Sequence, residues 1–94
     1  MTTLLDSHIP VLNSDFKTEQ FDNEILLYSV TSTLAVYLNQ TAMMVYGLCD
    51  GNNSVGDIIT TLETAYPEQI SSIRADVTDS LQQLVDLGAI RLSA

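Results

Sequence analysis

Residues 33–51, "TLAVYLNQTAMMVYGLCDG", change their hydrophobic period at Asn39. Before this residue two sets of side chains alternate, which is typical of a strand with one face toward a core. Leu34, Val36 and Leu38 fall on one face, and Ala35 and Tyr37 fall on the other. Beyond it, apolar residues recur every three or four positions, and the Asn39 side chain can cap the helix that this spacing indicates. The stretch predicts a strand over 33–38 that leads directly into a helix over 40–49.

The same stretch ends in residue types that could carry chemistry, and we interpret each of them as structural. Cys49 lies on the apolar stripe next to an acid, whereas a reactive thiol needs an electropositive setting. Asp50-Gly51 is a helix-ending turn, because no acid closes a calcium loop here. His8 is the single histidine, and a metal site needs three or four convergent ligands. We therefore expect no catalytic residue, no metal site and no cofactor.

Two further helices are expected downstream. Ser54 caps the second helix, with an acid three residues later in a capping box, and Pro67 ends it. The third helix runs from residue 71 or 72 to Leu87, where Gly88 is a left-handed terminator. The apolar segment Ala89–Leu92 then returns as a short strand or wing. The last two helices and this segment match a winged helix-turn-helix arrangement.

The residues before the opening stretch predict a β-hairpin. Phe16–Phe21 and Glu24–Tyr28 suit strands, and Asp22-Asn23 between them is a turn signal. Residues 1–15 contain turn-forming residues around Pro10 and are expected to form a loosely attached arm. The expected class is therefore α+β: a winged helix-turn-helix with an N-terminal three-stranded antiparallel sheet followed by three helices. Its domain spans 16–94, after the arm at 1–15.

Composition excludes several classes of partner. The 94 residues include 12 acids and 3 bases, for a formal net charge of −9. Because binding to a phosphate backbone needs a basic stripe, we expect no nucleic-acid partner, and a winged helix-turn-helix DNA-binding transcription regulator is only the alternative function. No apolar run approaches the roughly 20 residues of a membrane span, and no secretory signal is visible. A cytoplasmic protein with no membrane partner is expected.

Two segments together resemble the PqqD-like family: "LNQTAMMVYGLCDGNNSVGDIITTL" (38–62) and "ADVTDSLQQLVDLGAI" (75–90). The matching residues are Leu38-Asn39, Ala42, Leu48-Cys49-Asp50-Gly51, Val55, Ile58, Asp76-Val77, Leu81, Leu84, Gly88 and Ile90. The resemblance covers about residues 16–92, and the order and spacing of these motifs make it fairly specific.

This resemblance implies a non-catalytic RiPP recognition element, a peptide chaperone that binds the leader segment of a ribosomally made precursor peptide. The family presents the leader to a modifying enzyme, for which a radical SAM protein is one candidate. In PqqD itself the peptide is the precursor of pyrroloquinoline quinone. The pathway stays open between quinone cofactor biosynthesis, a lasso peptide, a sactipeptide and another product.

The resemblance also implies where the leader binds, namely as an added strand on the third strand and against the third helix. On the strand we expect contacts from Leu34, Ala35, Val36 and Tyr37. On the helix we expect them from Arg74, Val77, Thr78, Leu81 and Val85. Core packing alone is an equal alternative for Val36, Val77 and Leu81, whereas Arg74 suits a leader carboxylate. The free strand edge also leaves a homodimer open as an alternative.

Overall fold

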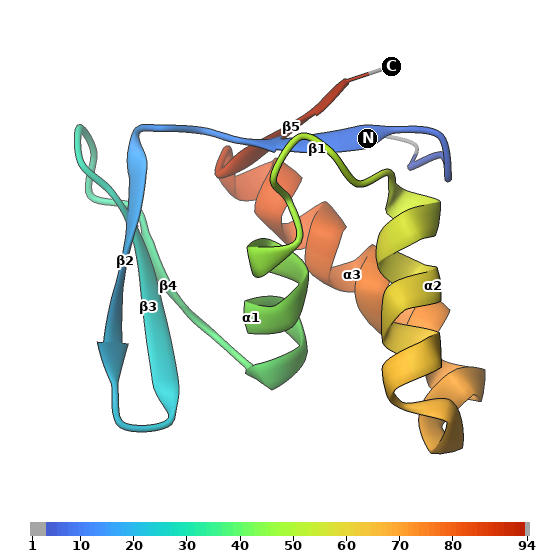
Figure 1. Ribbon diagram of the computed structural model, residues 1–94. Helices are drawn as coiled ribbons and strands as arrows, with labels where there is room; N and C mark the ends of the chain where they lie inside the picture. The colour runs from blue at the N-terminus through green and yellow to red at the C-terminus, as the bar shows by residue number, and fades with distance from the viewer. Residues whose placement is uncertain (1–3, 94) are drawn as a thin grey trace.

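The computed structural model describes residues 4–93, whose backbone forms two antiparallel sheets and three α-helices (Figure 1). The main elements are β2 (Phe16–Phe21), β3 (Glu24–Ser29), β4 (Ala35–Leu38), α1 (Gln40–Gly47), α2 (Val55–Ala65) and α3 (Ile70–Leu87). The three strands form one sheet in the order β2-β3-β4. The predicted α+β class, with a three-stranded antiparallel sheet followed by three helices, is confirmed.

The helices begin and end where local sequence satisfies their free backbone groups. The Asn39 side chain accepts a hydrogen bond from the backbone N–H of Ala42 at 2.8 Å. Ser54 and Asp57 form the predicted capping box, each side chain accepting from the other residue's backbone N–H. Gly88 ends α3 with φ of +88°, in the left-handed region that favours glycine. These caps confirm the predicted helix termini to within a few residues.

Several boundaries differ from the prediction by one or two residues. β4 begins at Ala35 because residues 30–34 form the connection from β3. α1 ends at Gly47, two residues before Cys49. α3 begins at Ile70, because the chain passes through a short 3-10 helix, η1 (Pro67–Gln69), directly into it. None of the helices within residues 4–93 is long and apolar enough to cross a membrane.

The N-terminal segment is part of the fold, and the expectation of a loosely attached arm is wrong. β1 (Ile9–Leu12) pairs antiparallel with β5 (Ile90–Ser93). The His8 carbonyl oxygen also accepts from the backbone N–H of Val55 at 2.8 Å, at the start of α2. Pro10 masked this strand in the sequence, but β1 is paired along its length with β5 alone, with a single bridge from Val11 to Asp50 on its other side, and proline is tolerated in such an edge strand. Its side chain is among the fully buried ones.

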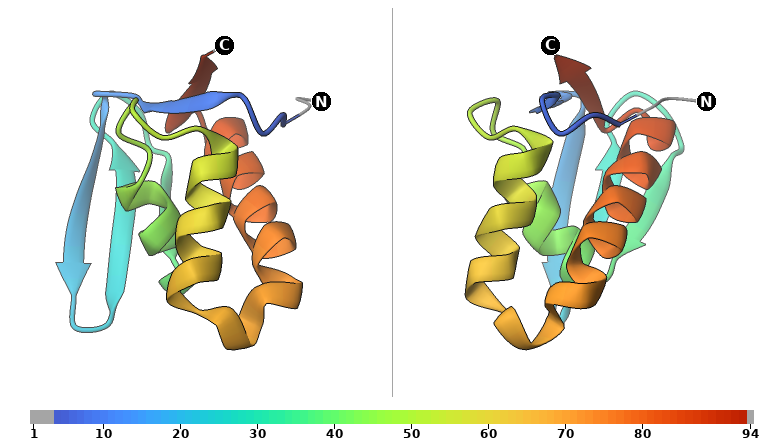
Figure 2. Two further views of the ribbon diagram at one scale, coloured as in Figure 1. Left: turned by 45° about the vertical axis from the view of Figure 1, so that its right-hand side comes forward. Right: turned by 90° about the vertical axis from the view of Figure 1, so that its right-hand side faces the viewer.

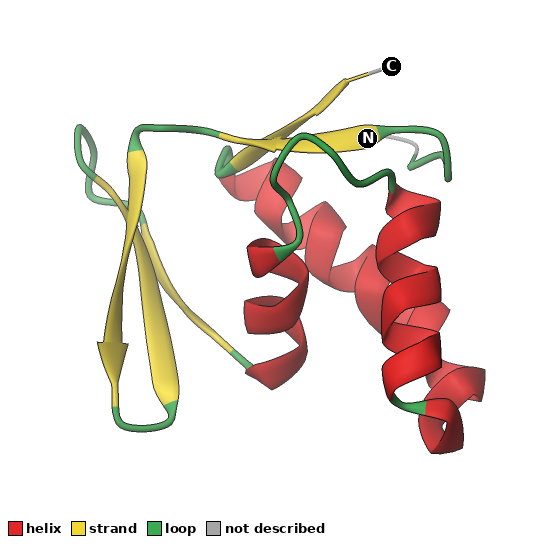
Figure 3. Cartoon of the chain, in the orientation of Figure 1, coloured by secondary structure: helices red, strands yellow, loops and turns green. Residues whose placement is uncertain are grey.

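The β2-β3-β4 sheet lies on one side of α1, and α2 and α3 lie on the other (Figures 1 and 2). β1 and β5 cross the end of the helical layer, as the yellow strands above the red helices show in Figure 3. β4 is an edge of its sheet and leads through Asn39 into α1. This connection brings the sheet edge close to the helices.

One core joins these layers. Leu27 of β3, Val45 of α1, Ile58 of α2 and Val77 of α3 are all completely buried. Burying one such side chain stabilises the folded state by about 1.5–3 kcal/mol. Cys49 is buried in the same core, and burial raises the pKa of its thiol to about 12. The structural interpretation of Cys49 is confirmed.

Candidate peptide-binding edge and hollow

The free edge of β4 carries backbone groups that its own sheet does not use. β4 pairs with β3 in a register that joins Val36 to Leu27 and Tyr37 to Leu26. The backbone N–H of Ser29 donates to the Leu34 carbonyl oxygen at 2.9 Å, which makes this pair a hydrogen-bonded one.

Hydrogen-bonded and non-hydrogen-bonded pairs alternate along an antiparallel ladder. Leu34, Val36 and Leu38 therefore direct their backbone groups toward β3. Ala35 and Tyr37 direct theirs away from it. The outward N–H and C=O groups of these two residues can form a ladder with one more strand.

The side chains of β4 alternate as the sequence predicted. Val36 is half-buried and Leu38 is buried, on the face toward the core. Tyr37 points the other way and is 59% exposed, beside the exposed Ala35. Leu34 belongs to the core-facing set by alternation, yet it is 48% exposed. An apolar surface thus continues past the end of the core along this face of β4.

A carboxylate fixes the connection that leads into β4. Asp15 accepts hydrogen bonds from Ser29 Oγ and Thr31 Oγ1, each at 2.7 Å. The bond from Ser29, followed by that from Thr31, holds the pKa of Asp15 below its usual value. The Asp15 carbonyl oxygen also accepts from the backbone N–H of Val30. Sequence reasoning missed this residue, because it joins the turn before β2 to the end of β3 and the connection into β4 through a tertiary contact.

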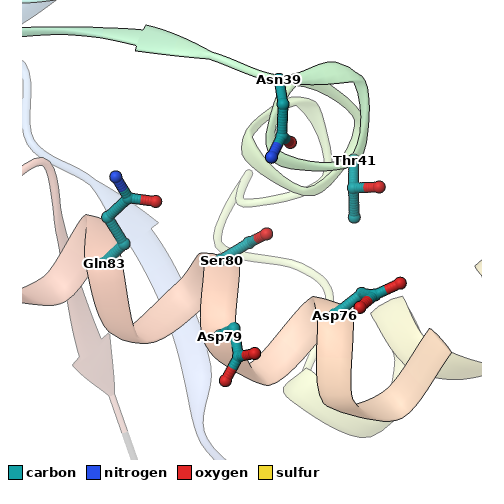
Figure 4. Close-up of a pocket in the computed structure, with 6 residues that line it drawn as sticks. All are labelled: Asn39, Thr41, Asp76, Asp79, Ser80 and Gln83. Carbon is teal, nitrogen blue, oxygen red and sulfur yellow. The ribbon is translucent and has the colours of Figure 1, made fainter. Parts of the chain in front are cut away.

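An open hollow lies where the end of β4 meets α3. It has a volume of about 320 Å³. The residues that line it are Asn39, Thr41, Asp76, Asp79, Ser80 and Gln83. In Figure 4, the Gln83 side chain rises from α3 toward the strand that leads to Asn39, whereas Asp79 points away at the rim. We call this space the hollow.

The hollow is polar and acidic. Two of its six lining residues are aspartates, and none is a base. Lys17 lies on β2, at the opposite edge of the sheet, and Arg91 lies on β5. The face of α3 beside β4 would therefore repel a phosphate backbone, which does not favour the DNA-binding alternative.

The structure places the five predicted helix residues away from the hollow. Val77 and Leu81 are completely buried in the core. Arg74 donates from Nη1 and Nη2 to the Asp6 carboxylate at 3.0 and 3.1 Å. This bond lowers the pKa of Asp6, and together with the nearby charge of Glu63 on α2 it raises the pKa of Arg74. Arg74 is thus on the α2 side of α3.

Thr78 and Val85 share that side of α3 with Arg74. Each of the three residues is two positions from a residue that lines the hollow, which is a rotation of about 200° around the helix axis. The hollow-lining partners are Asp76, Ser80 and Gln83. The expectation that the Arg74 stripe faces the β4 edge is therefore wrong. Asp76, Ser80 and Gln83, which line the hollow, also recur at helical spacing in the sequence, but a polar stripe fits a solvated surface as well.

The fold is shared with a solved structure. It resembles "TbiB1 in Complex with the TbiA(beta) Leader Peptide" with a TM-score of 0.73 and 14% sequence identity, over 89% of this chain and 98% of that chain. At this identity the likeness shows the architecture, a small α+β domain with a three-stranded sheet beside helices. No curated protein matches the chain significantly.

The family model "Coenzyme PQQ synthesis protein D (PqqD)" matches residues 24–90. The chain belongs to this family. The resemblance predicted from residues 38–62 and 75–90 is confirmed.

Proposed function

We propose that this chain is a non-catalytic RiPP recognition element that binds the leader segment of a precursor peptide and presents it to a modifying enzyme. The observation that carries the proposal is the free edge of β4, where Ala35 and Tyr37 turn backbone donors and acceptors outward beside the hollow. PqqD family membership supports it, as does the fold shared with a protein whose structure holds a leader peptide.

In this function the leader adds to the sheet as a fourth strand next to β4. Backbone hydrogen bonds to Ala35 and Tyr37 supply affinity that depends little on sequence, and side-chain surfaces supply the specificity. Leu34 and Val36 offer the apolar surface on the core-facing side. On α3 the contacts come from the flank that lines the hollow, not from the Arg74 stripe.

The chain acts in this proposal by holding a peptide, not by reacting with it. Its thiol at Cys49 is buried and has a raised pKa, so a nucleophilic role would need the core to open. Within residues 4–93, no three His, Cys, Asp or Glu side chains are grouped to hold a metal ion. The proposal includes a cytoplasmic location and an enzyme partner, with a radical SAM protein as one candidate.

Backbone amide NMR tests this function. The probes are synthetic N-terminal segments of any short open reading frames near this gene, titrated into the ¹⁵N-labelled full chain. We expect the largest shifts at residues 33–38 and on the α3 flank around Ser80 and Gln83. Shifts confined to the β1–β5 sheet, or none at a tenfold excess of leader, would contradict strand addition at β4. A homodimer through the same edge would instead give shifts that depend on protein concentration without peptide.

A further inference from the structure

We infer that this site selects a basic leader segment, with a Lys or Arg side chain that enters the hollow from an apolar strand. The inference rests on the proposed function, because it names the chemistry of the peptide that the β4 edge binds. It reverses the sequence-based expectation that Arg74 meets a leader carboxylate. The observations that carry it are the charge of the hollow, the position of Arg74 and the alternation of β4.

The charge of the hollow sets the sign of the preferred peptide. Asp76 and Asp79 line it without a base among the other lining residues. Within residues 4–93, the ion pair that the chain forms joins Arg74 to Asp6, and neither aspartate of the hollow takes part in it. Because Arg74 is on the other side of α3, an arriving cation meets Asp76 in the hollow and Asp79 at its rim, and neither carboxylate is paired with Arg74. The net charge of −9 adds a long-range attraction for cations.

The alternation of β4 sets the position of the basic residue. In an added strand, side chains paired with Val36 and Leu38 point to the core-facing side, and side chains between them point outward. The hollow begins at Asn39, directly after Leu38. The inward residue at the Leu38 end is thus the one that can reach Asp76.

The neighbouring inward residue meets different surroundings. It pairs with Val36, which is half-buried, next to the exposed Leu34. It therefore contacts apolar surface about 7 Å along the strand from the basic position. The expected pattern in the leader is an apolar residue and a Lys or Arg two positions apart.

A peptide selection tests the inference and does not require the sequence of the leader. A display library of random 12-residue peptides is selected on the full chain, and each enriched peptide is synthesised and checked by amide NMR for shifts in β4. We expect these peptides to share a Lys or Arg two positions from an apolar residue. Replacing that base with Glu should raise the dissociation constant at least about threefold.

Matched variants separate the hollow from the general charge of the protein. Asp76→Asn combined with Asp79→Asn should weaken binding of the selected peptide about threefold to twentyfold, at the scale of two exposed ion pairs. Asp86→Asn removes a charge from the same helix at a position that does not line the hollow. It should change the dissociation constant by less than about twofold. Thermal melts verify that all variants fold.

Each outcome decides between the two proposals. Peptides that shift β4 amides but carry no basic residue at a fixed spacing would overturn the charge inference and leave the proposed function standing. So would an equal loss of affinity in Asp86→Asn and in the double variant, because a diffuse attraction would explain it. If no selected peptide shifts β4, the proposed function fails, and the inference fails with it.

Discussion

Arg74 is one of three bases in the chain, and its placement decides the charge of the proposed site. Its bidentate bond to Asp6 satisfies the guanidinium on the α2 side of α3. Asp76, two residues later, faces the opposite way because each residue turns the helix by about 100°. Arg74 and Asp76 are only two positions apart, yet they place opposite charges on opposite sides of α3.

Asp15 provides a pH-dependent prediction at this scale. Its pKa is lowered by hydrogen bonds from Ser29 and Thr31, so the folded-state pKa is below the unfolded value of about 3.9. The stabilisation is complete above the unfolded value and is lost as the pH falls through the folded-state value. Between pH 6 and pH 3 we expect the amides of Ser29 and Val30, which donate to the carbonyl oxygens of Leu34 and Asp15, to lose protection from hydrogen exchange, after correction for intrinsic exchange.

The controls for this pH effect are two neutral variants. Asp15→Asn should show low protection of the Ser29 and Val30 amides already at pH 6 and little further change on acidification. Asp6→Asn removes another carboxylate with a lowered pKa, at the Arg74 contact, and should leave the response of this connection unchanged. The same pH response in the wild type and in Asp15→Asn would show that another group controls the connection.

At the scale of elements, the four residues of β4 alternate between two functions. Two of them bond β3, and the other two direct their backbone groups to the free edge. Val36 and Leu38 hold the strand to β3 and to the core, and Ala35 and Tyr37 leave one row of backbone groups open. A short edge strand limits unwanted self-association, because few groups are exposed in a row. In the proposed function, the same short edge would favour a peptide whose side chains match the surface beside β4.

A proline pair tests this division of the backbone groups. Ala35→Pro removes one outward N–H and changes the side chain little, so we expect a folded protein whose leader affinity is about threefold to tenfold weaker. Val36→Pro removes an N–H that bonds β3, and we expect it to lower the unfolding free energy clearly. Denaturation measured by circular dichroism and binding measured by calorimetry distinguish the two. Equal destabilisation by both prolines would mean that the assigned alternation is wrong.

A glycine pair tests the helix termini. A methyl group at either Gly88 or Gly47 would meet no atom within 4 Å, so crowding does not distinguish them. Gly88 has φ of +88°, and Gly88→Ala should lower the unfolding free energy by about 1 kcal/mol or more. Gly47→Ala lies in α1 without that strain and should be neutral or stabilising by up to about 1 kcal/mol. Urea denaturation of the two variants gives the comparison.

At the scale of the whole molecule, the two ends of the chain complete one fold. β1 pairs with β5, and the segment before β1 binds the start of α2 through the carbonyl oxygens of His8 and Asp6. Arg74 adds a contact from α3 to the same segment. The N-terminal residues therefore join α2, α3 and the C-terminal strand, and they lie outside the part that the family model matches.

Truncation tests this role. Removing residues 1–12 deletes β1 with the buried Pro10, and we expect a loss of about 2–4 kcal/mol in unfolding free energy, the scale of one or two buried side chains. Asp6→Ala removes the surface ion pair alone and should cost less than about 1 kcal/mol. A truncated chain as stable as the full one would restore the sequence-based expectation of a loosely attached arm.

The sequence by itself determined the local features of this protein. Period changes, the caps at Asn39 and Ser54 and the terminator Gly88 act within one or two turns, so they predicted the three helices, the three-stranded sheet and the α+β class. The motifs in residues 38–62 and 75–90 gave the resemblance to the family. The tertiary structure alone decided the rest. The pairing of β1 with β5, the Asp15 network and the Arg74–Asp6 bond join residues that are distant in sequence. The flank of α3 that faces β4 depends on how the helix is rotated in the core, and helical spacing is compatible with either flank.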